Sequence, residues 1–296
     1  MRDAPRPVVD PALLNPTAAT RWTNLGWWDA ATTATASHAI PYPDAARALA
    51  QRVGEAARLR PGDVVVDMAC GYGDSLALWV TAFGAARVVG VEPNPVVAGA
   101  VRARIAAWGL ADRITVVPAT AETFDLAARA PDATAVVCVD AAYHFRSRAA
   151  WLRAIARAAA PGTRLGFSDL ACPISGAGAA RRRTPSAAAD PMAPRTLRWA
   201  ASQAGIPPEN LWALEAIPSA LVAAGYEGVA VTDAGAPILD GFRAFARRSR
   251  GAWLAQPHRG GWRALATAWW LGRVRPTLTM VCVGAQVREQ KRGTAR

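Results

Sequence analysis

The sequence predicts an α/β fold in which helices cover both faces of a mostly parallel sheet. Short apolar runs alternate with amphipathic segments of helical length, and these runs are apolar throughout instead of alternating polar with apolar residues. Strands that are buried on both sides have this composition, because helices cover each face of a parallel sheet. We find no internal repeat in the pattern.

The elements follow in order along the chain. A helix is predicted over 43–59, where Ala45, Leu49 and Val53 share one face after a proline and an early aspartate. A second helix is expected to begin near Ser75. Five strands are predicted at 64–68, 87–92, 113–119, 134–140 and 163–170, with further helices at 93–109 and 147–162.

The composition limits the class of protein. With 296 residues, 52% hydrophobic and 19% charged, the chain is ordinary globular material. It contains neither an apolar run of about 18 residues nor the apolar core of a signal peptide, so we expect no membrane span and a cytoplasmic location. The four cysteines lie far apart without CxxC spacing, which indicates buried thiols and predicts no metal site.

The net charge of +12 raises the question of an anionic partner. The chain has one lysine among 34 basic residues and is rich in alanine, as expected from a GC-biased genome, and this weakens the charge signal. Arginines cluster at 181–185, 242–250 and 288–296. We interpret these clusters as solvated faces, and nucleic acid is not the predicted partner.

One stretch predicts a ligand site. In a parallel sheet, ligands bind beyond the carboxyl ends of the strands. Asp67 closes the first strand there, Gly71 and Gly73 allow a tight backbone turn, and a helix N-terminus follows. Glu92 ends the second strand, where a carboxylate can accept hydrogen bonds from both hydroxyls of a ribose. The pattern predicts a cofactor that contains a nucleoside.

The glycine spacing excludes two common sites. The loop from Ala69 to Asp74 lacks the third glycine of G-x-G-x-x-G, and the lysine of a P-loop is absent. It resembles instead the D-x-G-C-G-x-G motif of class I S-adenosylmethionine (SAM) methyltransferases, with Ala69 in the place of the first glycine. The resemblance implies SAM as the cofactor.

The resemblance covers roughly residues 20–284. It rests on "NLGWW", "VVGVEPN", "VVPATAE", "VDAAYHF", "APGTRLGFSDL" and "PTLTMVCVGAQ", in the family's order. Thr120 stands where the family has an aspartate that bonds the adenine amino group. The resemblance implies a cofactor site made of Asp67, Ala69, Gly71, Gly73, Glu92, Pro93, Asn94, Thr120, Ala121, Glu122 and Asp140.

The family's architecture is a Rossmann-like seven-stranded sheet with helices on both faces, an N-terminal helical cover and a lid inserted between strands five and six. Four regions are expected on that basis. They are the N-terminal cover at 1–47, the SAM-binding core at 48–172, the lid at 173–214, and the C-terminal part of the sheet with the tail at 215–296.

Substrate and catalytic residues are predicted beside the fourth strand. Tyr143 and His144 follow that strand, at a position that lies beside the transferred methyl group in the family. His144 is the candidate general base and Tyr143 its catalytic neighbour, and a purely structural histidine remains an alternative. Trp27 and Trp28, in the N-terminal cover, are candidate substrate contacts.

Tryptophans also occur farther along the chain. Trp199 and Trp212 fall in the expected lid, which favours an apolar or aromatic substrate, although they could instead fill the lid's own core. The segment 261–272 is expected to be a helix packed on the sheet, with a membrane-facing aromatic helix as the alternative.

The sequence therefore predicts a SAM-dependent methyltransferase, monomeric or homodimeric, that acts on a small metabolite of specialised biosynthesis. The acceptor is an oxygen, nitrogen or carbon atom. Two alternatives stay open: an RNA or protein methyltransferase, against which "DAAY" stands in place of N-P-P-Y, and a protein that binds SAM without transferring methyl.

Overall fold

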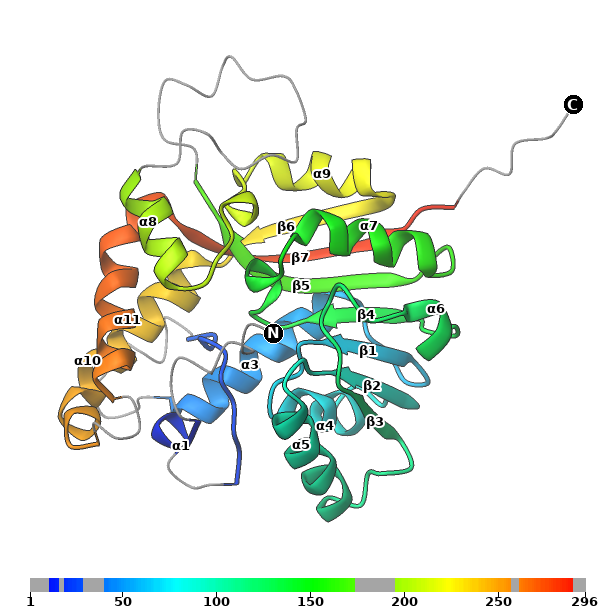
Figure 1. Cartoon of the computed structure of the whole chain (residues 1–296), viewed down its shortest axis with the longest axis horizontal. Coiled ribbons are helices and arrows are strands. Elements are labelled where there is room, and N and C mark those ends of the chain that lie inside the picture. The colour runs from blue at the N-terminus through cyan, green and yellow to red at the C-terminus, as the bar shows by residue number, and fades with distance from the viewer. Residues whose placement is uncertain (1–10, 16–18, 29–39, 174–194, 257–260, 290–296) are drawn as a thin grey trace, which may run out of the picture.

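The computed structural model describes residues 11–15, 19–28, 40–173, 195–256 and 261–289. Their strands form one sheet in the order β3-β2-β1-β4-β5-β7-β6 (Figure 1). Strands β1 to β5 run parallel, and β7 is antiparallel to both β5 and β6. The bounds are β1 Val64–Met68, β2 Arg87–Val91, β3 Ile114–Val117, β4 Ala135–Cys138, β5 Arg164–Ala171, β6 Tyr226–Asp233 and β7 Thr279–Val287. The predicted seven-stranded sheet is confirmed.

The strand order reverses at β1. This strand pairs with β2 on one side and with β4 on the other, so the connections leaving β1 and β4 run in opposite directions across the sheet. The loops that follow these two strands separate there and leave a crevice at the carboxyl edge. The site is therefore positioned by topology before any side chain is considered.

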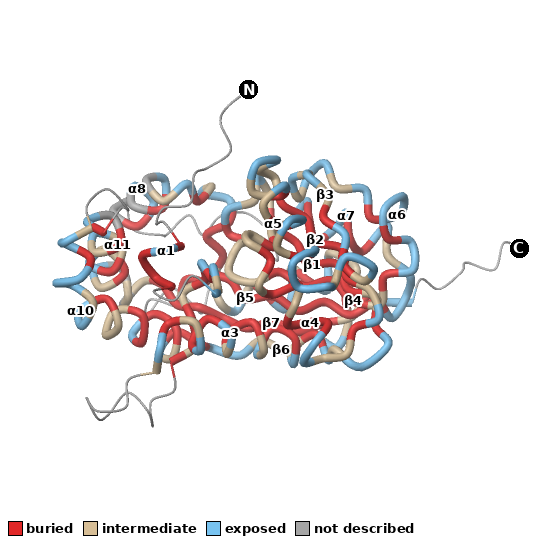
Figure 2. Tube along the Cα trace, turned by 90° about the horizontal axis from the view of Figure 1, so that it is seen from below, coloured by how far each residue is buried: buried red, intermediate tan, exposed pale blue. Residues whose placement is uncertain are grey.

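Helices cover both faces of the sheet, and alternate residues of each strand meet them. On β1, Val65 packs with the helices of one face and Val66 with those of the other. The first face carries α3 (Tyr42–Ala56), α4 (Asp74–Thr81) and α5 (Pro95–Ala107). The second carries α6 (Leu126–Arg129), α7 (Arg148–Ala158) and α9 (Ala216–Ala224). The burial colours of Figure 2 show the buried strands between exposed outer surfaces.

A helical cap lies beyond the carboxyl ends of the strands, at the left of Figure 1. It consists of α1 (Pro11–Leu14), α8 (Arg195–Gln203), α10 (Gly241–Leu254) and α11 (Gly261–Val274). The π-helical turn η4 (Ala236–Asp240) leads from β6 into α10. Trp28 of the N-terminal region joins this cap, since its ring stacks on Phe245 at a centroid distance of 4.9 Å.

The cap differs from the sequence prediction in two ways. Its helical hairpin α10–α11 is inserted between β6 and β7, in a region expected to be sheet and tail. The helix predicted at 261–272 exists, but it packs against α10 and not on the sheet, so that part of the prediction was wrong. A Cβ at Gly261 would lie 1.9 Å from the carbonyl oxygen of Trp253, which shows how closely the two helices meet.

Only part of the predicted lid lies among the described residues. Residues 195–214 form α8 and the 3-10 turn η3 (Pro208–Asn210), and 174–194 lie outside the described residues. Trp212 is buried beneath the Arg148 guanidinium, which lies 3.9 Å from the ring centroid, so it fills the protein core. Trp199 is exposed on α8. In the described part of the chain, no helix is long and apolar enough to cross a membrane.

A buried ion pair joins the second-face helices to the sheet. Arg148, at the start of α7, pairs with Asp169 near the end of β5, and both side chains are buried. Arg148 also donates to the carbonyl oxygen of Asn210 at 2.9 Å. Removing one charge would leave the other uncompensated in a medium of low dielectric constant.

We therefore expect Asp169→Asn to lower the free energy of unfolding by about 3–5 kcal/mol. The matched control is Asp132→Asn, which breaks the exposed pair with Arg87 and should cost no more than about 1 kcal/mol. Urea denaturation of the two variants measures the difference. Similar losses in both would contradict the structural role of the buried pair.

Candidate active site

The loop between β1 and α4 has the geometry that its glycines predict. Gly71 and Gly73 have φ values of 52° and 85°, in the left-handed region that glycine adopts readily. A Cβ at Gly73 would lie 2.6 Å from Cγ1 of Val101, so this glycine also lets α5 pack closely on the loop. Ala69 adopts φ 62° in spite of its Cβ, at a cost of roughly 1 kcal/mol.

Asp67 lies under this loop with almost no exposed surface. Its Oδ2 accepts a hydrogen bond from the indole Nε1 of Trp79 at 2.7 Å, and the Ser75 hydroxyl also bonds to it. Burial raises the pKa of Asp67 to about 6, because a charged carboxylate loses its hydration there. Both partners come from α4, so the helix that follows the loop fixes the acid at the end of β1.

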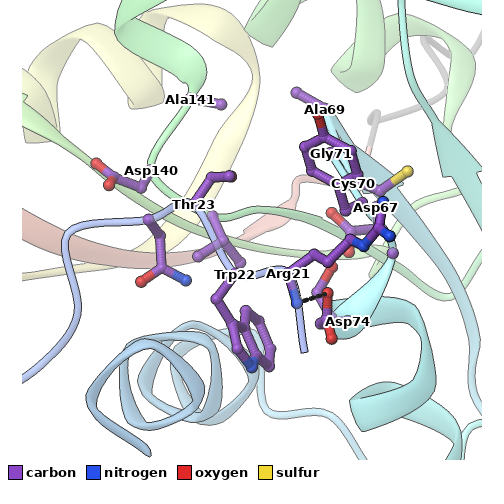
Figure 3. Close-up of a pocket in the computed structure, with 15 residues that line it drawn as sticks. Arg21, Trp22, Thr23, Asp67, Ala69, Cys70, Gly71, Asp74, Asp140 and Ala141 are labelled. Atoms are coloured by element: carbon purple, nitrogen blue, oxygen red, sulfur yellow. Dashed lines mark hydrogen bonds between the residues drawn. The ribbon is translucent and has the colours of Figure 1, made fainter. Parts of the chain in front are cut away.

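An N-terminal strap, residues 19–28, crosses in front of the loop. Figure 3 shows Arg21, Trp22 and Thr23 passing between the glycine loop and Asp140. The backbone N–H of Arg21 donates to Asp74 at 3.1 Å, and that of Leu25 donates to Asp140 at 2.7 Å. Carboxylates at the start of α4 and on the loop after β4 therefore hold the strap in place.

Arg104 of α5 reinforces one end of this arrangement. Its guanidinium forms two hydrogen bonds of 2.9 Å with the carboxylate of Asp74, and it bonds to the carbonyl oxygen of Tyr72 in the glycine loop. It also reaches the carbonyl oxygen of Ala19 at 3.4 Å. One arginine thus connects α5, the loop and the strap.

Asp140 occupies the other side of the crevice, two residues after β4. Its φ is 55°, an uncommon value for a residue with a side chain, and its N–H donates to the Ser168 hydroxyl at 2.9 Å. The hydroxyl of Tyr143 donates to its Oδ1 at 2.9 Å. Burial raises the pKa of Asp140 to about 7 and that of Tyr143 well above its usual range, so the phenol remains a hydrogen-bond donor.

These groups surround an open hollow at the strand ends with a cavity volume of about 90 Å³, which we call the strand-end hollow. Among the predicted cofactor residues, it brings together Asp67, Ala69, Gly71, Gly73 and Asp140. The strap contributes Arg21, Trp22, Thr23 and Asn24, and the loop and α4 add Cys70, Tyr72, Asp74 and Ser75.

Glu92 lies directly behind the glycine loop. Its carboxylate accepts the N–H of Asn94 at 2.9 Å and the N–H of Gly71. Burial raises the pKa of Glu92 above its ordinary value. Asn94 uses its side-chain oxygen to cap α5 through Val96 N–H at 2.9 Å, and Pro93 connects the two. These residues adjoin the loop but do not line the hollow.

The other predicted cofactor residues lie on the loop after β3. The Thr120 and Thr123 hydroxyls are 3.1 Å apart in a turn, and Ala121 is half-buried. Glu122 accepts the N–H of Arg146 at 2.8 Å, which ties this loop to the one after β4. None of the three predicted residues, Thr120, Ala121 and Glu122, lines the hollow.

The candidate catalytic and substrate residues divide into two groups. Tyr143 and His144 form the short turn η1 (Ala142–His144) after β4, and Nδ1 of His144 lies 3.4 Å from the carbonyl oxygen of Gly205. His144 is exposed, yet desolvation by neighbouring protein atoms lowers the pKa of its imidazole below the ordinary value.

Trp27 and Trp28, like Tyr143 and His144, do not line the strand-end hollow. Trp27 lies under the guanidinium of Arg52 on α3, which is 5.1 Å from its ring centroid. Trp28 is buried in the cap. The role of both tryptophans as substrate contacts stays a prediction.

Sequence reasoning missed the strap, Asp74 and Arg104. The strap bonds through backbone N–H groups, which leave no side-chain signature at Arg21 or Leu25. The ion pair between Asp74 and Arg104 joins the N-terminus of α4 to α5. The signal available in the sequence was an acid at the start of one helix followed by an arginine on the next helix. In the described part of the chain, no cluster of three His, Cys, Asp or Glu side chains could hold a metal ion.

Comparison with known proteins shows which fold carries this geometry. Residues 65–162 match the methyltransferase domain family. A SAM-dependent methyltransferase from Geobacter sulfurreducens, solved with S-adenosylhomocysteine, superposes with a TM-score of 0.61 at 19% identity, over 97% of this chain and 100% of the other. The chain has the class I SAM-dependent methyltransferase fold.

Other solved structures share the methyltransferase fold over their whole length. The geranyl diphosphate C-methyltransferase from Streptomyces coelicolor A3(2) has a TM-score of 0.67 at 15% identity, covering 96% of this chain and 94% of the other. The [4+2]-cyclase SpnF has a TM-score of 0.67 at 20% identity, covering 94% and 92%. No curated protein matches the sequence. The predicted methyltransferase fold is thus confirmed, and residues 65–162 carry the match to the methyltransferase domain.

The buried acids of the site predict how stability depends on pH. Asp67 has a pKa of about 6 in the folded chain against an ordinary value of 3.8, so the folded state binds this proton more tightly. The stability that this group contributes is greatest below the unfolded pKa of 3.8. It is lost as the pH rises through the folded pKa of about 6. Asp67→Asn keeps an oxygen acceptor for Trp79 and should raise the free energy of unfolding by about 3 kcal/mol at about pH 8.

At about pH 4 the same substitution should change stability little, because the carboxylate is largely protonated in the folded chain. Urea denaturation of the ligand-free protein at both pH values measures this. Equal gains at the two pH values would show that the effect does not come from titration of Asp67.

Proposed function

We propose that the chain transfers a methyl group from SAM to a small apolar metabolite. The observation that carries the proposal is the charge state of the strand-end hollow. Among the described residues, the buried acids Asp63 and Asp169 each pair with an arginine, whereas Asp67 and Asp140, which face the hollow, have no basic partner. A cationic ligand would supply the missing charge.

The residues present fit SAM in charge. A Cβ at Gly71 would make only an ordinary contact of 3.6 Å with the Thr23 hydroxyl, so it is the positive φ of 52° that favours glycine in this loop. Asp67 and Asp140 would face the positively charged part of the cofactor, and Glu92 would accept hydrogen bonds from its ribose hydroxyls. When bound, SAM supplies an electrophilic methyl carbon attached to a sulfonium.

The remaining chemistry belongs to the chain. The strap and the cap cover the carboxyl ends of the strands and keep water from the reacting atoms. Neutral His144 can accept a proton from a hydroxyl or phenol acceptor, and the Tyr143–Asp140 hydrogen bond holds the turn that carries it. The likeness to a geranyl diphosphate C-methyltransferase, whose named substrate carries an apolar geranyl chain, supports an apolar acceptor.

A second candidate function follows from the likeness to SpnF, which is named as a [4+2]-cyclase. A chain of this fold could use the same hollow to bind SAM while promoting a reaction without methyl transfer. The two functions differ in the mass of the product. Methyl transfer gives a product heavier than the substrate by one CH₂, whereas a cyclisation leaves the mass unchanged.

The test of cofactor binding is calorimetric titration with S-adenosylhomocysteine. We expect the chain to bind it. Glu92→Ala should weaken binding about 10–100-fold, because it removes the free energy of hydrogen bonds to a charged group. Asp112→Asn, an exposed acid beyond α5, is the control and should bind like the parent chain. Absent binding, or binding that Glu92→Ala leaves unchanged, would count against the proposed site.

The role of His144 is tested by separating turnover from cofactor affinity. With an acceptor that carries a hydroxyl, His144→Gln should lower kcat about 10²-fold or more, because it removes the base, and leave the Kd for S-adenosylhomocysteine unchanged. Tyr143→Phe removes only the hydrogen bond to Asp140 and should reduce kcat less. Full activity of His144→Gln would assign the histidine to structure.

A further inference from the structure

The α10–α11 hairpin has an unusual charge. From Gly241 to Thr277 the sequence contains no aspartate or glutamate and carries a net charge of +8, against +12 for the whole chain. The arginines responsible are Arg243, Arg247, Arg248, Arg250, Arg259, Arg263, Arg273 and Arg275. The proposed methyl transfer at the other end of the cap uses none of them.

Two of these arginines are tied to the protein. Arg243 and Arg275 both approach Asp240, at 3.5 and 3.2 Å. Arg247, Arg248 and Arg250 are exposed on α10, and no acidic partner for them occurs among the described residues. The exposed part of the hairpin is therefore a surface of unneutralised positive charge.

Large apolar side chains are exposed on the same hairpin. Leu254 ends α10 at 52% exposure, and Trp262 and Trp269 stand on α11 at 56% and 63%. They are three of the seven large hydrophobic side chains that the described residues expose. The guanidinium of Arg273 lies 4.8 Å from the ring centroid of Trp269, so aromatic and basic groups are interleaved.

The two helices of the hairpin each have a buried side and exposed positions. Helix α10 buries Phe242, Ala246 and Trp253 in the cap, while α11 buries Ala264, Ala268 and Leu271 in the same core. The exposed positions Trp262, Ala266, Trp269 and Arg273 follow helical spacing along the opposite side of α11. Figure 2 shows exposed segments of both helices along the outer edge of the cap. We call this surface the basic-aromatic face.

From this face we infer that the protein docks peripherally on bilayers that contain anionic phospholipid. Tryptophan rings are favoured at the boundary between headgroups and acyl chains, and arginines beside them pair with lipid phosphates. Each arginine near an anionic surface adds to the attraction, and the absence of acidic residues leaves nothing to oppose it. Docking would bring the cap, and with it the proposed site for an apolar acceptor, next to the bilayer.

Charge decides between this occupant and a second copy of the chain. A symmetric dimer would place the basic-aromatic face against itself, and like charges would meet across the interface. An anionic bilayer offers negative charge to the arginines of the face and an apolar layer to its tryptophan rings. Single-stranded RNA offers charge and stacking, but no partner for the aliphatic Leu254 at the end of α10.

The experiment is flotation of the full chain with vesicles of phosphatidylcholine, with and without about a quarter phosphatidylglycerol, at about 0.1 M salt. We expect binding to the anionic vesicles and at least about tenfold less to phosphatidylcholine alone. Trp262→Ser/Trp269→Ser and Arg247→Gln/Arg248→Gln should each weaken the anionic binding about tenfold or more.

The matched control is Arg153→Gln/Arg157→Gln, which removes the same charge from exposed positions of α7. It should bind vesicles like the parent chain. Absence of binding overturns the inference, as does equal weakening by the control, which would indicate attraction by net charge alone. Binding of a single-stranded RNA that displaces the chain from vesicles, and that depends on the same tryptophans, also overturns it. S-adenosylhomocysteine binding by each variant reports separately on the proposed active site.

Discussion

The site depends on two carboxylates at the strand ends, Asp67 and Asp140, for which the described residues supply no basic partner. Asp67 and Asp140 end the two strands between which the strand order reverses, so the topology brings them to opposite sides of one hollow. Their burial raises both pKa values and stores a preference for positive charge. The loop, the strap and the α4 indole all contribute hydrogen bonds that keep these acids in place. A methyl donor bearing a sulfonium suits this environment, whereas an anionic nucleotide would not.

The fold could be predicted almost completely from the sequence because its signals are local. Apolar runs mark the five parallel strands, and the glycine loop from Ala69 to Gly73 fixes where α4, the helix after β1, starts. The last antiparallel strand came from the family resemblance and not from the local pattern. Within the site, Asp67 and Asp140 were found because each directly follows an apolar run, a position that topology turns into a binding edge.

The parts that sequence reasoning missed depend on contacts between distant segments. Leu25 meets Asp140 through a backbone N–H, which has no signature in the residue type. The positions of the tryptophans could not be predicted for a related reason. Composition shows that Trp28 and Trp212 are large and flat, but only the packing of Phe245 and Arg148 against them shows that they fill the interior. The α10–α11 hairpin between β6 and β7 could not be predicted, because its amphipathic pattern fits a helix packed on a sheet equally well.

The strap has a consequence for how the molecule is made. It is synthesised first, but its anchor Asp140 follows 115 residues later, so on the ribosome Leu25 waits on the order of 10 s at ordinary elongation rates. During that interval the apolar side chains of Trp22 and Trp28 have no core to enter. A nascent chain paused before β4 would therefore expose the tryptophans of the strap. Closure of the strand-end hollow must be a late event in folding during synthesis.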